Sequence, residues 1–327
     1  MIPEELNYSK IEEIYNNLLP YTIKTPIIKN HNHLNDFFNT NLLLKLEFFQ
    51  HAGCFKVRGV INNILNLTNE QKINGITAVS AGNHAIATSF AANKFKIKNK
   101  IFMYDTANKY RVEKVKSLNA NLVLTNPINA FKDVEKASEN EGYNYIHPFD
   151  GKYTIQGTAS LGYEICQQVE NIENIIISVG GGGLIAGVGS LVRQKFPNSN
   201  IIGVEPECAR GMSDSLQKGK ALSKVEINTI ADSLGPPLHT DYSFSICQNT
   251  INKMVTVSDE SMKKCMKLMF DHYKFILEPA CVAGIAALIG PLKNNFKNEN
   301  TIIILCGSNI DLKTWHQYTK DQKTIDI

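Results

Sequence analysis

The sequence contains no metal-binding cysteine pattern and no concentration of positive charge. Its seven cysteines include no C-x-x-C pair, so neither a zinc ribbon nor a disulfide framework is indicated. Lysines and arginines are scattered between acidic residues, and the net charge is only +3, which argues against a nucleic-acid-binding surface. We therefore expect reduced, mostly buried thiols and no nucleic acid as a partner.

The start of the sequence does not predict a secretion signal. Residues 1–5 include two acids and are not followed by basic and apolar signal regions. Residues 175–192 carry no charge, but their six glycines and their strand-turn-helix pattern argue against a membrane-spanning helix. We therefore expect a cytoplasmic protein that does not bind membranes.

What the sequence does contain is an alternation of short apolar runs and helical periodicities. The pattern predicts strands near 42–46, 76–79, 101–104, 122–124, 175–179, 201–204 and 302–305, and helices near 59–67, 85–95, 109–118, 156–170, 184–196, 259–275 and 279–291. Such alternation is typical of α/β proteins, in which an open, mostly parallel sheet is flanked by helices. A chain of 327 residues is long enough for two such sheets.

Four consecutive glycines, Gly180 to Gly183, stand between a predicted strand and the helix that starts near Leu184. Glycine allows positive φ and lets bare backbone approach a ligand. The first N–H groups of a helix have no acceptor within the helix, so they favour a phosphate group at this turn. A turn without a ligand would need only one or two glycines.

The same turn also fits a second type of cofactor site. Gly181, Gly183 and Ala186 read as G-x-G-x-x-A, and Glu205 closes the next apolar run, as in dinucleotide-binding proteins. A nicotinamide-dependent dehydrogenase is therefore an alternative at this point. A monophosphate cofactor would need only the anion-binding half of the pattern.

Another informative segment surrounds Lys56. Residues 45–59 read KLEFFQHAGCFKVRG. Phe55 and Val57 can remove water from the amine of Lys56, and the lower pKa that results favours Schiff-base chemistry. The segment closely resembles the signature K-x-E-x-x-Q-x-x-G-S-F-K-x-R-G of the threonine dehydratase and serine racemase family, with Cys54 in place of the serine.

Further segments resemble motifs of this family in the same order along the chain. They are the loop Ser80-Ala81-Gly82-Asn83-His84, the element Glu278-Pro279-Ala280 and the ending Cys306-Gly307-Ser308-Asn309-Ile310-Asp311. In the family, the first of these binds the substrate carboxylate, the second flanks the cofactor ring, and the third begins beside the ring nitrogen. The resemblance covers nearly the whole chain.

The resemblance implies an α/β enzyme of pyridoxal-phosphate fold type II with two domains. Residues 1–68 and 148–327 would form the large cofactor-binding domain, and residues 69–147 the small substrate-loop domain. Lys56 would bind the cofactor and act as the catalytic base. The cofactor-binding residues implied are Lys56, Phe55, Asn83, Gly180, Gly181, Gly182, Gly183, Leu184, Glu278 and Cys306, and the substrate-binding residues are Ser80, Ala81, Gly82, Asn83 and His84.

The activity implied is that of a serine/threonine ammonia-lyase, a homodimer that converts a β-hydroxy amino acid to a 2-oxo acid and ammonia. Serine racemase and 3-hydroxyaspartate dehydratase remain alternatives, whereas a dehydrogenase would leave the other motifs unexplained. Ala81 stands where serine racemases have a second serine, so elimination is expected to dominate. Because the sequence ends soon after Asp311, a regulatory domain after the catalytic unit is not expected.

The resemblance also bears on metal binding. Racemase-like members bind a divalent cation at positions that correspond here to Glu205, Ala209 and Gly211. One carboxylate is missing from this set, which leaves Glu205 as a candidate ligand in a thin oxygen cage. We expect weak or absent activation by magnesium or calcium, and Glu205 could instead cap a helix.

Overall fold

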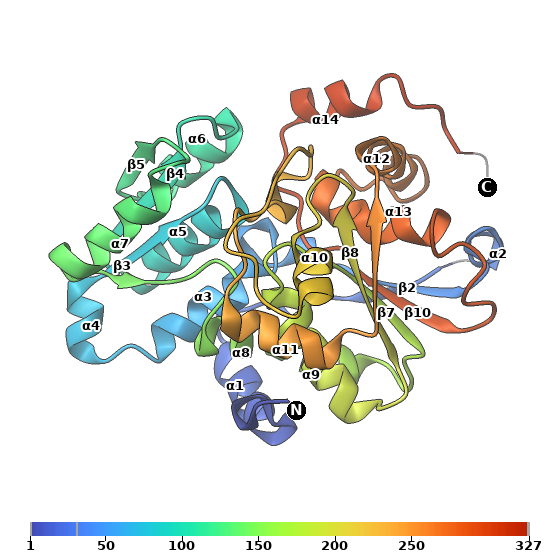
Figure 1. Ribbon diagram of the computed structural model, residues 1–327, viewed down its shortest axis with the longest axis horizontal. Helices are drawn as coiled ribbons and strands as arrows, with labels where there is room; N and C mark the ends of the chain where they lie inside the picture. The colour runs from blue at the N-terminus through green and yellow to red at the C-terminus, as the bar shows by residue number, and fades with distance from the viewer. Residues whose placement is uncertain (1, 31, 326–327) are drawn as a thin grey trace.

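The computed structural model describes residues 2–30 and 32–325, and it contains two sheets that lie side by side (Figure 1). The large sheet has the strand order β1 (Ile27–Lys29), β2 (Asn41–Lys45), β10 (Asn300–Ile304), β7 (Asn174–Ser178), β8 (Asn200–Pro206) and β9 (Lys253–Val257). The small sheet has the order β5 (Leu122–Thr125), β4 (Asn99–Tyr104), β3 (Ile76–Val79) and β6 (Asn144–Tyr145).

All strand pairs are parallel except that of β1 with β2. The predicted fold class, open and mostly parallel sheets flanked by helices, is therefore confirmed. The domain boundaries at 68/69 and 147/148 stay a prediction. None of the helices in the described part of the chain has the length and apolar character that crossing a membrane requires.

Helices follow or precede almost every strand. The α-helices are α1 (Tyr8–Leu18), α2 (Asn32–Phe38), α3 (Lys56–Leu65), α4 (Asn69–Asn74), α5 (Asn83–Phe95), α6 (Lys109–Ser117), α7 (Ala130–Glu141), α8 (Lys152–Gln168), α9 (Gly183–Lys195), α10 (Gly211–Lys218), α11 (Asp241–Thr250), α12 (Asp259–Tyr273), α13 (Ala283–Ile289) and α14 (Leu312–Thr319). Short 3-10 helices are η1 (Glu4–Leu6), η2 (Glu47–Phe49), η3 (His51–Gly53), η4 (Asp232–Leu234) and η5 (Pro279–Val282).

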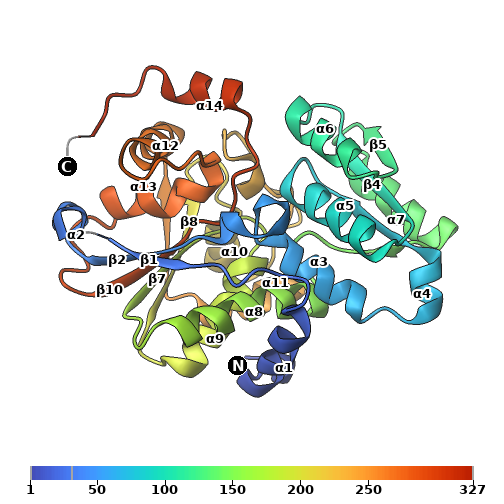
Figure 2. The same cartoon turned by 180° about the vertical axis from the view of Figure 1, so that it is seen from behind.

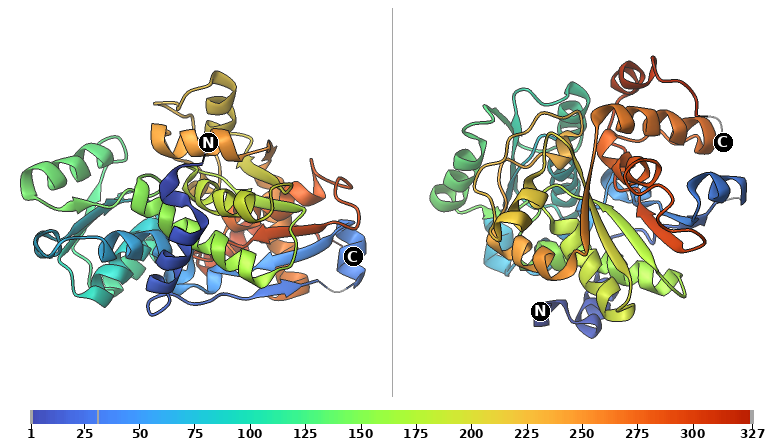
Figure 3. Two further views of the ribbon diagram at one scale, coloured as in Figure 1. Left: turned by 90° about the horizontal axis from the view of Figure 1, so that it is seen from below. Right: turned by 45° about the vertical axis from the view of Figure 1, so that its right-hand side comes forward.

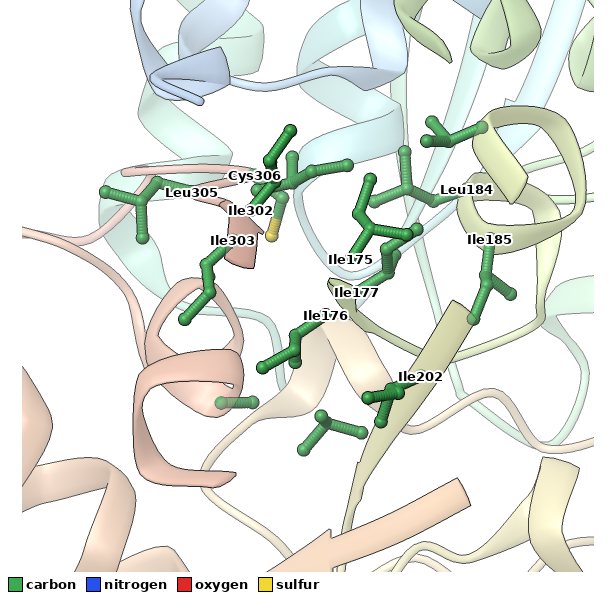
Figure 4. Close-up of a cluster of buried hydrophobic side chains, with 14 of the residues drawn as sticks. Ile175, Ile176, Ile177, Leu184, Ile185, Ile202, Ile302, Ile303, Leu305 and Cys306 are labelled. Carbon is green, nitrogen blue, oxygen red and sulfur yellow. The ribbon is translucent and has the colours of Figure 1, made fainter. Parts of the chain in front are cut away.

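The large sheet is covered on both faces. Helices α12 and α13 lie on one side of it, and α8, α9 and α11 lie on the other (Figures 1 and 2). All five side chains of β7 are buried, as expected for a central parallel strand that has helices on both faces. Figure 4 shows the isoleucines of β7 between side chains of β10 and those at the start of α9.

The small sheet separates its two faces by the alternation of side chains along β4. Ile101 and Met103 pack with residues of α5 and α6, whereas Phe102 packs with Ala130 and Val134 of α7. The period of two places successive side chains on opposite faces. Figure 3 shows this smaller layer beside the large sheet. Residues that follow β3, β7 and β10 line the cavities described below.

Close backbone contacts fix α3, the helix that begins with Lys56. A Cβ atom at Gly157 of α8 would lie 2.4 Å from the Cα atom of Gly59 in α3. A Cβ atom at Gly187 of α9 would lie 2.2 Å from Thr158 Oγ1 of α8. Contacts this short require glycine. The three helices are therefore packed so closely that the first turn of α3 has a defined place.

Candidate active site

The predicted site residues meet at the carboxyl ends of the strands, in two adjoining cavities. The inner cavity is lined by Phe55, Lys56, Asn83, Gly180, Gly181, Gly182, Gly183, Leu184, Glu278 and Cys306, among others. The outer cleft is lined by Lys56 and by Ser80, Ala81, Gly82, Asn83 and His84, among others. Lys56 and Asn83 line both. The structure thus brings the predicted cofactor and substrate residues together, while their roles stay a prediction.

The glycine turn presents a row of hydrogen-bond donors to the inner cavity. Among the described residues, the N–H groups of residues 180–185 have no hydrogen-bond acceptor, and all six residues line this cavity. They lie at the start of α9, where the helix dipole adds positive potential. This arrangement fits a phosphate group.

The four glycines of this turn are needed for two different reasons. Only Gly182 has a positive φ, at +92°. A Cβ atom at Gly181 would lie 2.1 Å from the ring of Phe149, and one at Gly180 would lie 3.0 Å from the carbonyl oxygen of Ser233. The close approach of neighbouring segments therefore accounts for more of the run than left-handed backbone does.

Lys56 is the first residue of α3 and lies between the two cavities. Its Nζ atom donates a hydrogen bond of 2.5 Å to the carbonyl oxygen of Pro148 and lies 4.9 Å from the centre of the Phe55 ring. Burial lowers the pKa of the Lys56 ammonium group to about 8. A neutral amine is therefore accessible near neutral pH, as nucleophilic and base chemistry require.

Other residues of the lysine signature form a buried charge cluster behind α3. This inner cluster consists of Lys45, Glu47, Arg58 and Glu164. Lys45 Nζ lies 2.6 Å from Glu164 Oε1, while Arg58 lies 2.5 Å from Glu47 and 3.0 Å from Glu164. Two cations face two carboxylates, so the cluster is electrically balanced. It joins β2, η2, α3 and α8, and thereby positions Lys56. Glu164 was not predicted, because it lies over 100 residues away in sequence from its partners.

The loop Ser80 to His84 follows β3 and begins α5. The Gly82 N–H group donates to Ser80 Oγ at 3.1 Å. In the described part of the chain, the N–H groups of Ala81, Asn83 and His84 have no acceptor, and these three residues line the outer cleft. Free donors at a helix start suit a carboxylate.

The side chain of His84 is turned away from solvent and is hydrogen-bonded. It is buried, and its Nε2 atom lies 2.8 Å from the carbonyl oxygen of Ile146. Burial lowers the pKa of His84 to about 3, so the neutral ring donates to this carbonyl. Its side chain therefore holds the loop against the segment that leads from β6 to α8.

Asn83 connects the loop to the two C-terminal motifs. Its Nδ2 atom donates to Glu278 Oε1 at 2.5 Å, and its Oδ1 atom accepts from Asn309 Nδ2 at 2.6 Å. Both contacts are buried. The motifs recognised separately in the sequence thus form one hydrogen-bonded unit at the inner cavity.

A second charge cluster, which the sequence did not reveal, lies at the junction of the cavities. This cleft cluster consists of Arg111, Asp232 and Glu278. Arg111 of α6 contacts Asp232 at 2.5 Å and Glu278 at 3.4 Å. One cation faces two carboxylates, and burial raises the pKa of Glu278, which Arg111 only partly offsets. The cluster links the small sheet to loops of the large one.

The two cysteines of the predicted motifs are buried and neutral. Burial raises the pKa of Cys54 to about 12. The pKa of Cys306 is raised well above its usual range by a hydrogen bond with Cys281 and by burial. Backbone contacts between Cys54 and Gly307, and from Phe55 N to Cys306 O at 3.2 Å, join the lysine segment to the end of β10.

Three aromatic residues of the outer cleft were also missed. Tyr104 ends β4, Phe131 lies in the first turn of α7, and Phe149 lies in the segment that joins β6 to α8. A single aromatic residue after a strand carries no distinctive sequence signal, so the structure was needed to place these side chains.

Glu205 lies outside both cavities and caps α10. Its carboxylate accepts hydrogen bonds from Met212 N at 2.6 Å, from Ser213 N at 2.9 Å and from Ser213 Oγ at 2.6 Å. Burial raises the pKa of Glu205 to about 7. No group of three or more potential ligands from histidine, cysteine, aspartate and glutamate occurs within residues 2–30 and 32–325. The helix-cap interpretation thus describes the contacts of this residue.

Comparison with known proteins gives a consistent result. A family model described as pyridoxal-phosphate dependent enzyme matches residues 18–307. The phenylserine dehydratase of Ralstonia pickettii is 39% identical over 280 residues, which cover 85% of this chain and 86% of that protein. A catabolic L-threonine dehydratase of Staphylococcus aureus is 32% identical over 308 residues, covering 92% of this chain and 88% of that protein.

The fold is shared with a solved structure of a different activity. The structure of maize serine racemase superimposes with a TM-score of 0.88 at 30% sequence identity, and the alignment covers 95% of this chain and 96% of that one. Likeness of fold therefore does not separate elimination from racemisation. The two reactions must be distinguished by the residues of the site.

Proposed function

The chain belongs to the family of pyridoxal-phosphate-dependent enzymes, and we propose that it is an ammonia-lyase acting on L-threonine, L-serine or a related β-hydroxy amino acid. The products are a 2-oxo acid and ammonia. The dehydratase relatives support this reaction, and the family sets aside the nicotinamide-dependent dehydrogenase. One observation carries the proposal: the lysine with a lowered pKa shares a cavity with the row of N–H donors at Gly180 to Ile185.

The residues of the inner cavity fit pyridoxal 5′-phosphate. The N–H groups at the start of α9 would hold its phosphate, and Lys56 would hold its aldehyde carbon. Asn83, Glu278 and Cys306 line the rest of this cavity and would surround the ring. When bound, pyridoxal phosphate withdraws electrons from the Cα atom of an amino acid and makes its proton acidic.

Lys56 serves as the base that takes this proton on its Nζ atom. The pKa of about 8 leaves part of the amine neutral near pH 7, and part protonated, so that Nζ can both accept and return a proton. The carbonyl oxygen of Pro148 orients Nζ by accepting its hydrogen bond. The first turn of α3 is held in place by the inner cluster.

The loop after β3 orients the substrate. The N–H groups of Ala81, Asn83 and His84 would bind the substrate carboxylate, and the start of α5 adds a favourable dipole. With the carboxylate held there, and with the amine and the Cα–H bond near Lys56, the remaining substituent of Cα, the β-carbon with its hydroxyl, extends into the outer cleft. This geometry suits loss of the β-hydroxyl as water.

Ala81 favours elimination over racemisation. A racemase needs a second acid or base on the face of the substrate Cα atom opposite Lys56, and a methyl group can neither accept nor donate a proton. The hydroxyl of neighbouring Ser80 accepts a hydrogen bond from Gly82 N. Incubation of L-serine should therefore give pyruvate with little D-serine by chiral chromatography, and Ala81→Ser should gain some racemase activity. Substantial D-serine from the unmodified enzyme would favour the racemase instead.

The role of Lys56 is tested by Lys56→Ala. The variant should lose at least about 1,000-fold in ammonia release, since both the covalent attachment and the base are removed. Borohydride reduction of the unmodified enzyme should trap the cofactor on the peptide that contains Lys56, as mass spectrometry would show. Full ammonia release by Lys56→Ala would refute the proposed function.

The assembly and the compartment are also part of the proposal. The family resemblance supports a homodimer in the cytoplasm. Large apolar side chains such as Phe49 and Leu312 are exposed, at 50% and 67%, and could be covered in a dimer. Sedimentation equilibrium would measure the mass, and a monomer at micromolar concentration would contradict this assembly.

A further inference from the structure

The walls of the outer cleft beyond the carboxylate-binding loop are aromatic and apolar. They are formed by Tyr104, Phe131, Pro148, Phe149, Pro236 and Pro237. The cleft has a volume of about 90 Å³, several times the roughly 10–15 Å³ that one water molecule needs. It therefore has room for an organic substituent larger than a methyl group.

The described residues of this cleft leave no basic side chain available to pair with a negatively charged substituent of the substrate. The basic residues that line the cleft are Lys56, Arg111 and His84. His84 is neutral because burial lowers its pKa to about 3. Arg111 already contacts Asp232 at 2.5 Å and Glu278 at 3.4 Å. A second carboxylate on the substrate would add a third negative charge to this arginine and would be disfavoured.

The aromatic walls are held in place by packing on both sides of the cleft. Tyr104 and Phe131 pack against the cluster of the small sheet that contains Phe102 and Val134, while both remain only partly buried. On the opposite side, Phe149 is buried against the glycine turn, and its ring lies 4.5 Å from that of His147 in an edge-on arrangement. The cleft is thus preformed and does not depend on flexible side chains.

We propose that the substrate carries an aromatic ring on its β-carbon, so that the preferred substrates are β-aryl-β-hydroxy amino acids. This inference rests on the proposed function, which places the carboxylate at the loop after β3 and the amine near Lys56. The β-substituent then meets Tyr104, Phe131 and the two prolines. A methyl group or a hydrogen atom would leave these apolar walls in contact with water, whereas an aryl ring would cover them and stack on them.

The overall reaction balances without a further reactant. Cα–H and Cβ–OH bonds break, and one water molecule is released. The enamine that results takes up one water molecule as it hydrolyses, and ammonia leaves. The net change is the loss of ammonia, and phenylserine would give phenylpyruvate.

The test compares substrates on the complete enzyme with its cofactor. We expect kcat/KM for L-phenylserine to exceed that for L-threonine and L-serine at least tenfold, and 3-hydroxyaspartate to be the poorest substrate. Faster turnover of threonine, or of 3-hydroxyaspartate, would overturn the aromatic assignment while leaving the ammonia-lyase intact. If none of these amino acids released ammonia, the proposed function would fall, and with it this inference.

A variant with a matched control locates the effect. Phe131→Ser should lower kcat/KM for L-phenylserine at least tenfold more than it lowers kcat/KM for L-serine, and an unchanged circular dichroism spectrum would show that the variant is folded. Ile128→Ser, an exposed residue (86%) between β5 and α7, should change neither. Equal losses on both substrates in Phe131→Ser would contradict a role in side-chain recognition.

Binding provides a readout that is independent of turnover. L-Phenylalanine has the aryl ring but no β-hydroxyl, so it cannot undergo the elimination. Titrated into the enzyme and followed by cofactor absorbance, it should bind at least tenfold more tightly than L-alanine, and Phe131→Ser should remove most of this difference. Equal affinities for the two amino acids in the unmodified enzyme would overturn the proposal.

Discussion

The two charge clusters of this protein are each built on an arginine that contacts two carboxylates, but their balance differs. In the inner cluster, Lys45 adds a second cation, and the side chains of all four members are at most 1% exposed. In the cleft cluster, Arg111 alone faces Asp232 and Glu278, and Asp232 is 46% exposed. The first is neutral in sum and closed to water, while the second carries an excess negative charge and reaches the solvent.

This difference in charge balance is reflected in the pKa values of Glu164 and Glu278. Burial favours the protonated form of Glu164, but Arg58 and Lys45 together outweigh it and lower its pKa. Burial raises the pKa of Glu278, and Arg111 is insufficient to reverse this, since Asp232 acts in the opposite direction. A balanced cluster suits a fixed scaffold for Lys56, whereas the cleft cluster leaves an excess of negative charge at the junction of the two cavities.

The largest expected effect tests the scaffold. Glu164→Gln removes the negative charge between Lys45 and Arg58, so two buried cations would share the remaining carboxylate of Glu47. We expect the free energy of unfolding to fall by about 3–5 kcal/mol, measured by urea denaturation. Glu141→Gln is the control, because Glu141 contacts Lys100 at 2.6 Å but is 46% exposed, and it should cost less than about 1 kcal/mol. Equal costs would remove the distinction between buried and exposed pairs.

A smaller effect is expected at the cleft cluster, and in a different quantity. Arg111→Lys retains the charge but loses the fork that contacts Asp232, Glu278 and the carbonyl of Asn309 together. We expect kcat/KM to fall about tenfold, which is about 1.4 kcal/mol, with a smaller loss of stability than in Glu164→Gln. Arg210→Lys, which alters the exposed pair with Asp214, should leave both quantities unchanged. A larger stability loss at Arg111 than at Glu164 would reverse the comparison.

The smallest expected effect is that the stability changes caused by substituting Glu164 and Glu278 depend on pH in opposite directions. The lowered pKa of Glu164 contributes stability above its unfolded value of 4.5, and this is lost as the pH falls through the folded pKa. The raised pKa of Glu278 acts in reverse, because its ionised form costs stability as the pH rises. Between about pH 7 and about pH 4, the penalty of Glu164→Gln should shrink.

Over the same range, Glu278→Gln should become less favourable relative to the unmodified protein as the pH falls, because the protonated carboxyl group then resembles the amide. Urea denaturation of both variants at the two pH values would measure this. If the two differences changed in the same direction, the clusters would not differ in charge balance as described.

Local sequence was sufficient for the central strands, the glycine turn and the neighbourhood of Lys56. Each of these depends on neighbouring residues, namely apolar runs and a helix start. Strands β1, β6 and β9 were not predicted; they are short or lie at a sheet edge, where fewer side chains are buried. The apolar pattern predicted one helix over 279–291, where the structure has η5 followed by α13.

The part of the site that could not be predicted depends on contacts between distant segments. Arg111 meets Asp232 and Glu278 across 121 and 167 residues. Tyr104, Phe131 and Phe149 share a cleft only because the small sheet packs beside the large one. No periodicity or spacing in the sequence predicts contacts between such distant segments. Site residues were therefore predicted where they belong to a local motif, and they were missed where only the fold brings them together.

Phe149 has a consequence for how this enzyme could change its substrate during evolution. Its ring and its backbone fill the space beside Gly181 and Gly183, so it belongs both to the wall of the outer cleft and to the support of the glycine turn. A mutation here that admits a new substrate also disturbs that turn. Tyr104 and Phe131 are not among the nearest neighbours of these two glycines. Selection for new substrates should therefore accumulate changes on the small sheet, and leave residue 149 among the last to diverge.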